Sequence, residues 1–87
     1  MVKRDLVIRN KQGLHARPAA LFVQIASKFD SQITVKKGKR RVNGKSIMGI
    51  LTLAVEKGSR ISIEAEGKDA KEAVEELERI VNDEESQ

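Results

Sequence analysis

The chain has 87 residues, which is enough for one small domain with a single two-layer core and too few for two such domains. Its 39% apolar and 34% charged residues are typical neither of a disordered chain nor of a membrane protein, and no apolar run approaches the roughly 20 residues that span a bilayer. The absence of cysteine excludes a disulfide framework and thiolate chemistry, and a single histidine is too few for a zinc site.

The charge of the chain is unevenly distributed around a formal net charge of +4. Residues 1–60 hold 14 Lys and Arg against 3 Asp and Glu, whereas residues 61–87 hold 3 against 10. This asymmetry favours an anionic partner for the basic part, whether nucleic acid, a phosphate group or an acidic protein. The first residues lack the apolar core of a signal peptide, so we expect a cytoplasmic location. Nothing in the sequence indicates an oligomer, and a monomer is the default expectation.

The first predicted elements are a short strand and a helix. Residues 6–8 (LVI) are compatible with a strand, and the polar residues that follow, up to Gly13, predict a loop. From Ala16 onward, apolar residues recur at helical spacing: Ala19, Phe22, Ile25, Ala26 and Phe29. Pro18 fits only in the first turn of such a helix, where its missing N–H would have had no intrahelical partner. The helix is therefore predicted to start at about His15 or Ala16.

The middle of the chain predicts a hairpin and a short helix. Ile33 and Val35 alternate with polar residues, and the basic residues 36–41 form the turn before Val42, so the hairpin has a strongly positive tip. Residues 43–44 (NG) signal another turn. Ser46 then has the position of an N-cap for a short apolar helix over residues 47–53.

The last third predicts one strand and one helix. Residues 61–65 alternate between apolar and polar after a turn at 56–59, as in a half-buried strand. Asp69 and Glu72 have capping-box spacing before the cleanest apolar stripe of the chain, which consists of Ala70, Ala73, Val74, Leu77, Ile80 and Val81. Residues 82–87 are expected to fray. The order β-α-β-β-α-β-α favours an α+β sandwich, with helices covering one face of an antiparallel sheet.

The only histidine and the only proline of the chain lie in residues 13–18 (GLHARP). If His15 caps the helix, its imidazole lies where free N–H groups of the first turn converge, and the positive end of the dipole favours the neutral, nucleophilic ring. A phosphoryl group on that ring would meet the same N–H groups, and Arg17 could contact its oxygens. Small Ala16 would leave access. Residue types alone also allow an ordinary loop histidine beside a solvated arginine.

The segments GLHARPA (residues 13–19) and KSIMG (residues 45–49) are similar to the two signature segments of the HPr family, the phosphocarrier proteins of the bacterial sugar phosphotransferase system. The similarity extends over nearly the whole chain and includes ASKF (residues 26–29) and AEG (residues 65–67). The resemblance implies one HPr-like domain over residues 1–87, folded as an open-faced β-sandwich with a four-stranded antiparallel sheet and three helices. It implies a phosphoryl carrier without turnover of its own and without a cofactor or metal.

The resemblance also assigns roles to residues. His15 would accept a phosphoryl group from enzyme I and pass it to IIA domains of sugar permeases, Arg17 would steady the phosphohistidine, and Ala16 would offer its backbone N–H. Ser46 resembles the serine that HPr kinase/phosphorylase phosphorylates in Gram-positive-type members, whose phosphorylated form is a corepressor for catabolite control protein A. Phosphate at an N-cap would add roughly −1.5 to −2 charge at a helix end that accepts anions, so we expect an electrostatic effect without refolding.

A partner-docking patch is expected beside the histidine loop, because a short helix cannot bury all of its apolar residues. In the family this patch docks partners, and the candidate docking residues are Ile47, Met48, Leu51, Ala20 and Lys45. Core packing is the expected role of the neighbouring Ile50 and Leu53.

Two other interpretations remain. In a regulatory paralogue Ser46 would matter and His15 would be idle, but known paralogues of that kind lack the histidine. A small nucleic-acid-binding domain could use residues 36–41, yet a chain with no Trp or Tyr and two core Phe has no stacking platform and would offer phosphate contacts alone.

Overall fold

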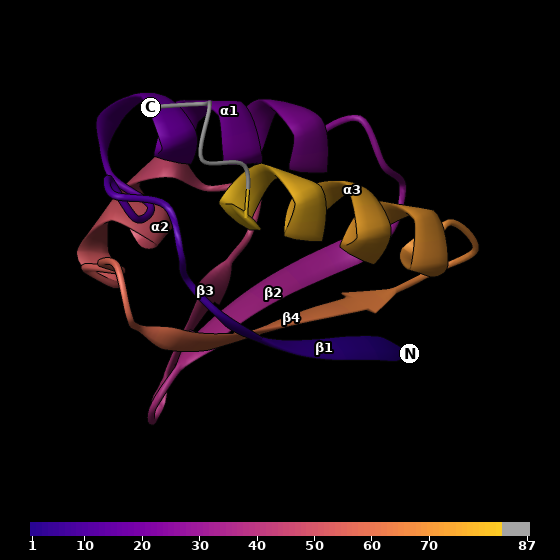
Figure 1. The fold of residues 1–87 in the computed structure, drawn as a ribbon. Coiled ribbons are helices and arrows are strands. Elements are labelled where there is room, and N and C mark those ends of the chain that lie inside the picture. The colour runs from indigo at the N-terminus through magenta and orange to yellow at the C-terminus, as the bar shows by residue number, and fades with distance from the viewer. Residues whose placement is uncertain (83–87) are drawn as a thin grey trace.

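The computed structural model describes residues 1–82. Its elements are β1 (Val2–Val7), α1 (Ala16–Ala26), β2 (Gln32–Lys37), β3 (Arg40–Asn43), α2 (Ile47–Thr52), β4 (Arg60–Glu66) and α3 (Ala70–Asn82). The four strands form one antiparallel sheet in the order β1-β4-β2-β3, and all three helices lie on the same side of it (Figure 1). The predicted α+β open-faced sandwich and its order of elements are confirmed.

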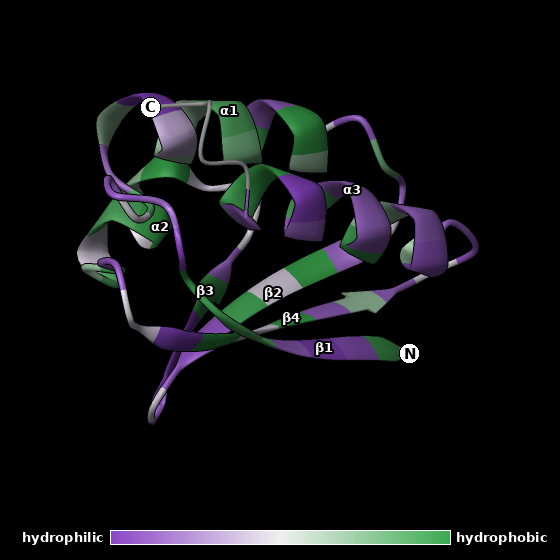
Figure 2. Ribbon diagram, in the orientation of Figure 1, coloured by the Kyte–Doolittle hydropathy of each residue, from purple (hydrophilic) through white to green (hydrophobic). Residues whose placement is uncertain are grey.

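Strict alternation along β4 separates the two faces of the sheet. Ile61, Ile63 and Ala65 are buried beneath the helices, whereas Ser62 and Glu64 lie on the opposite, open face. Helix α3 is largely hydrophilic (Figure 2), and its buried residues are all apolar: Ala70, Ala73, Val74, Leu77 and Val81. One buried apolar cluster contains residues from the sheet and from all three helices. Its largest fully buried side chains include Phe22, Ile33, Ile50, Ile63 and Leu77.

The first strand differs from the prediction, since it starts at Val2 and ends at Val7 instead of covering residues 6–8. Ile8 follows the strand but is buried, and its backbone N–H donates to the carbonyl of Ser59 at 2.9 Å. The charged residues at the start of the chain did not indicate a strand. They are tolerated in β1 because it lies at an edge of the sheet, where polar residues can alternate with apolar ones. Arg4, on the helix-facing side, forms an ion pair with Glu78 of α3.

Two other boundaries also shift. Helix α1 ends at Ala26, with the Ser27 N–H donating to the Val23 carbonyl at 2.9 Å, so Phe29 lies beyond the helix and packs half-buried against the core. The hairpin turn is shorter than residues 36–41, because Lys37 already pairs with Arg40 in the ladder. Much of the positive charge therefore lies on strands.

The predicted capping box at Asp69 is wrong in its detail. Its carboxylate accepts hydrogen bonds from the N–H of Asp30 at 2.8 Å, the N–H of Ser31 at 2.9 Å, and the hydroxyl of Ser31. These bonds lower the pKa of Asp69 below its ordinary value of 3.8, the Ser31 hydroxyl being the largest cause. Asp69 thus ties the start of α3 to the segment after α1.

Of residues 82–87, for which fraying is predicted, the structure describes only Asn82. Asn82 is the last residue of α3, and residues 83–87 lie outside the described residues. Within residues 1–82, none of the helices has the length and apolar character needed to cross a bilayer.

Candidate functional site

The loop that carries His15 is closed by hydrogen bonds of a buried asparagine. The Asn10 side chain donates to the carbonyl of Gly13 at 2.9 Å, and the Gly13 N–H donates to the Asn10 carbonyl at 3.2 Å. Asn10 is fully buried, and its Oδ1 atom has no partner within residues 1–82. Leu14, also fully buried, donates its N–H to the Val55 carbonyl at 2.9 Å. His15 therefore emerges from a loop that is fixed at both its base and its last residue.

His15 is the N-cap of α1, as predicted. Its backbone is extended, and its side chain makes no capping hydrogen bond to the described residues, so the imidazole is free to face a partner. His15 is half-buried. Because the first N–H groups of a helix lack intrahelical partners, the ring lies at an end of α1 that favours anions. The local geometry fits a nucleophilic ring whose product carries negative charge.

Ala16, the first helical residue, has a φ of +47°, which lies in the left-handed region. Such a conformation costs a non-glycine residue about 1–2 kcal/mol and persists only where the surroundings enforce it. Ala16 lies between two buried residues, Leu14 before His15 and Pro18 after Arg17, which hold the backbone on either side of it. The strain therefore adjoins His15 directly. Ala16 is exposed, and its side chain is a single methyl group.

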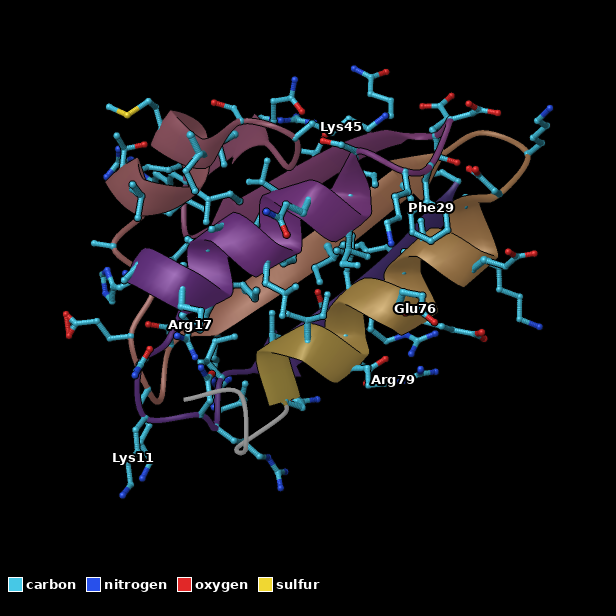
Figure 3. The ribbon with its side chains drawn as sticks, turned by 90° about the horizontal axis from the view of Figure 1, so that it is seen from above. Lys11, Arg17, Phe29, Lys45, Glu76 and Arg79 are labelled. Carbon is cyan, nitrogen blue, oxygen red and sulfur yellow. The ribbon has the colours of Figure 1, made fainter. Side chains whose placement is uncertain are left out.

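Arg17 and Pro18 complete the first turn of α1. Pro18 is buried in the third helical position, so the prediction that it lies in the first turn is confirmed. Arg17 is exposed and lies at the N-terminal end of α1 (Figure 3). Its guanidinium can therefore approach an anion held at that end of the helix.

A hollow of about 550 Å³ opens beside the ring, and we call it the His15 hollow. Its lining residues are Lys11, Gln12, His15, Ala16, Glu56 and Lys57. Sequence reasoning missed Lys11, Gln12, Glu56 and Lys57 as neighbours of His15. No local pattern marks Glu56 and Lys57, because they reach the site through the tertiary contact between Leu14 and Val55. The sequence alone shows only that both residues are charged and lie in a predicted turn.

Ser46 is the N-cap of α2, which confirms the predicted helix start. Its hydroxyl oxygen accepts a hydrogen bond from the Gly49 N–H at 3.0 Å. A Cβ atom at position 49 would lie 3.3 Å from this oxygen and 3.1 Å from the Val42 side chain, so glycine leaves space around the hydroxyl. Ser46 is partly exposed. A phosphate on it would therefore be placed at the start of α2, near the surface.

The exposed apolar residues of α2 form a second feature, the α2 patch, defined here as Ile47, Met48 and Leu51. Their exposed fractions are 38%, 66% and 37%, whereas Ile50 and Leu53 are buried. This division is the one expected from the sequence. Helix α2 and the start of α1 lie at the same end of the molecule in both views (Figures 1 and 3), and α1 packs against α2. The patch and His15 therefore share one end of the protein.

The last two candidate docking residues differ in position. Ala20 is exposed one turn after Ala16 and extends the accessible surface of α1. The Lys45 ammonium instead donates to the Phe29 carbonyl at 2.7 Å, and Figure 3 shows Lys45 toward the opposite end of α1 from Arg17. The structure thus brings Ala20 near the histidine end but ties Lys45 to the far end. Within the described part of the chain, no group of three acidic or histidine side chains could hold a metal ion.

Comparison with known proteins assigns nearly the whole chain to one family. The family model "PTS HPr component phosphorylation site" matches residues 2–83. The phosphocarrier protein HPr of Neisseria meningitidis serogroup A is 48% identical over 82 residues, which are 94% of this chain and 92% of that protein. The structure of the phosphocarrier protein HPr from Bacillus anthracis is 49% identical, with a TM-score of 0.91 over 93% of this chain and 96% of that chain.

The HPr-like protein Crh of Bacillus subtilis is 46% identical over 84 residues, which are 97% of this chain and 99% of that protein. Its crystal structure, described as a dimer with a swapped domain, has a TM-score of 0.76 and covers 97% of both chains. The family match spans nearly all of the chain, and both the sequence and the fold agree with it. The chain belongs to the HPr family, the phosphocarriers of the phosphotransferase system, whose partners include enzyme I and IIA domains.

Proposed function

We propose that His15 is the phosphoryl acceptor of this carrier. The observation that carries the proposal is an imidazole at the N-terminus of α1 that makes no capping bond to the described residues. In the reaction, the lone pair of a ring nitrogen forms the bond to phosphorus while the bond from phosphorus to the donor breaks and its electron pair stays with the donor. The proton on the other ring nitrogen passes to solvent. Arg17 and the Ala16 N–H stabilise the transferred oxygens.

The α2 patch is the surface on which partners dock in this proposal. Its apolar side chains are exposed, and α2 lies at the same end of the molecule as the start of α1, which His15 caps (Figure 1). Phospho-enzyme I supplies the group, and IIA domains of sugar permeases receive it, in the cytoplasm. Ala20 contributes to the docking surface because it is exposed on α1. Lys45 contributes only if its bond to Phe29 opens.

Ser46 is the proposed regulatory site. A phosphate there adds roughly −1.5 to −2 charge at the start of α2, where anions are favoured, so the fold is retained. The added charge lies next to the α2 patch and repels acidic partners. HPr kinase/phosphorylase would add this group, and catabolite control protein A would bind the product. A purely regulatory role with His15 idle is less favoured, because a histidine is present at position 15 and is partly exposed.

The test of the acceptor is phosphorylation with phosphoenolpyruvate and enzyme I, followed by acid treatment. Wild-type protein should take an acid-labile phosphate, His15→Ala should take none, and Ser46→Ala should behave as the wild type. With ATP and the kinase the outcome reverses, so the acid-stable product is lost only in Ser46→Ala. An acid-labile product on His15→Ala would show that another residue is the acceptor.

A further inference from the structure

Glu56 lies against the loop that carries His15, although the two residues are far apart in the chain. A Cβ atom on Gly13 would lie 2.2 Å from the Val55 carbonyl oxygen and 2.7 Å from the Cα atom of Glu56. The backbone at Glu56 is therefore in direct contact with the loop, and only a glycine at position 13 allows it. The hydrogen bond from Leu14 to Val55 fixes the same contact.

The turn after Val55 also holds Glu56 in one backbone position. The Glu56 N–H donates to the Ser59 hydroxyl at 2.9 Å, and the Ser59 N–H donates to the Glu56 carbonyl at 2.9 Å. Gly58 donates its N–H to the Ile8 carbonyl at 2.8 Å, which attaches the turn to the end of β1. The turn is closed by these bonds, so the Glu56 side chain starts from a fixed point at the rim of the His15 hollow.

The charges that line the His15 hollow are one carboxylate, Glu56, and two ammonium groups, Lys11 and Lys57. Among residues 1–82, no ion pair engages Glu56, whereas other acidic residues such as Glu64 and Glu78 are paired. Glu56, which has no ion pair among residues 1–82, thus lines the same hollow as the proposed phosphoryl acceptor. A phosphoryl group on His15 would bring about two negative charges into the same hollow.

We propose that Glu56 slows the phosphorylation of His15 and favours release of the phosphoryl group by repelling it, and that Lys57 opposes this effect. This inference rests on the proposed role of His15. Repulsion between the carboxylate and the phosphoryl group makes the phosphorylated form less stable than it would be beside a neutral residue, so the group is passed on more readily. The cost is slower acceptance from an anionic donor. Glu56 is a tuning residue, because it neither receives nor donates the phosphoryl group.

The test uses phosphoramidate, a small anionic donor that needs no partner protein. The lone pair of a His15 ring nitrogen attacks phosphorus, the phosphorus–nitrogen bond of phosphoramidate breaks, and ammonia leaves with that electron pair. The proton from the other ring nitrogen goes to ammonia or buffer. Because the chain has a single histidine, the phosphohistidine formed can only be on His15. The rate is followed by mass spectrometry of the intact protein, and thermal unfolding confirms that each variant is folded.

Glu56→Gln should accept phosphate about threefold faster than the wild type at low salt, and Lys57→Gln should be slower by a similar factor. Both effects should shrink at about 1 M salt, where charges are screened within roughly 3 Å. Glu66→Gln is the matched control, because it removes one exposed carboxylate at the far end of β4 and should change the rate little.

Three results would overturn the proposal: an unchanged rate in Glu56→Gln, a change of the same sign in both hollow variants, or an equal effect in Glu66→Gln. None of these depends on enzyme I. If the wild type reacts with phosphoramidate but not with phospho-enzyme I, the carrier function fails while the role of Glu56 is still measured.

Discussion

At the scale of the residue, the position of His15 depends on a few atoms at the base of its loop. Gly13 has a φ of +59° and Gly38 has a φ of +60°, so both glycines use a conformation that other residues rarely adopt. Of the two, only Gly13 is also crowded, since no atom of residues 1–82 lies within 4 Å of a Cβ atom at position 38. A side chain at position 38 would therefore meet backbone strain alone, whereas one at position 13 would meet both strain and a steric clash.

Replacing each of these glycines by alanine tests that separation. Gly38→Ala should lower the free energy of unfolding by about 1–2 kcal/mol, which is the cost of a left-handed alanine. Gly13→Ala should lower it by about 2–5 kcal/mol, because the new methyl group must also displace the backbone at Val55. Urea unfolding measures both. Equal losses would mean that the loop moves away from Val55 at little cost.

At the scale of the element, two short helix starts carry the chemistry, and their caps differ. Ser46 caps α2 with its hydroxyl group, whereas the His15 ring makes no capping hydrogen bond to the part of the chain that the structure describes. Removing the hydroxyl therefore costs stability, whereas an acidic residue can replace it as a cap and adds a charge that the helix end favours.

We expect Ser46→Ala to lower the free energy of unfolding by about 1 kcal/mol and to leave phosphoryl acceptance from enzyme I intact. Ser46→Asp should keep the stability of the wild type and slow that acceptance, because its charge lies beside the α2 patch. Chemical denaturation and the initial rate of phosphorylation give the two values. A stable Ser46→Asp variant with a wild-type rate would remove the electrostatic basis for regulation.

Helix α2 also separates docking from packing within one turn. Ile47 is 38% exposed and Ile50 is fully buried. Ile50→Ala should lower the free energy of unfolding by about 2–5 kcal/mol, whereas Ile47→Ala should change it by less than about 1 kcal/mol. Ile47→Ala should instead weaken binding to enzyme I by about tenfold, as measured by calorimetric titration. Unchanged binding would exclude Ile47 from the docking surface.

The tie between α3 and the segment after α1 predicts a dependence of stability on pH. Because the pKa of Asp69 is below 3.8 in the folded protein, the ionised carboxylate stabilises the fold fully above pH 3.8. This stabilisation is lost as the pH falls through the folded-state pKa. The difference in stability between the wild type and Asp69→Asn should therefore be largest at neutral pH and narrow below about 3.8. In a Ser31→Ala background, the loss of stability caused by Asp69→Asn should be smaller at neutral pH, since the Ser31 hydroxyl is the largest cause of the low pKa. Thermal unfolding from pH 2 to 7 measures the difference, and a constant difference would contradict the assignment.

At the scale of the whole molecule, local patterns predicted the helix starts but not the contacts between them. Pro18 and the apolar spacing after it placed the start of α1, and the turn at Asn43 placed Ser46 at the start of α2. The order of the elements and the covered face of the sheet followed from alternation. The His15 hollow could not be predicted, because Glu56 reaches it only when the sheet brings the turn after α2 against the loop before α1.

The anchored loop also predicts that the chain is a monomer. Crh is described as a dimer with a swapped domain, and an exchange of β1 between two copies of this chain would need a hinge between β1 and α1. Here that segment is closed by the bonds of Asn10 to Gly13 and attached to Val55 by Leu14, and β1 pairs with β4 of the same chain. Light scattering should give a mass of 9.7 kDa across the micromolar range. A mass twice as large would show that the hinge opens.

A chase of the phosphoryl group from the isolated protein tests most directly whether His15 carries that group. Protein labelled with ³²P through enzyme I is purified away from that enzyme and mixed with an unlabelled IIA domain. If His15 carries the group in transit, the label should move to the IIA domain and the protein should be able to accept phosphate again. Label that stays on the protein, or that is carried equally well by His15→Ala, would contradict a carrier that works through His15.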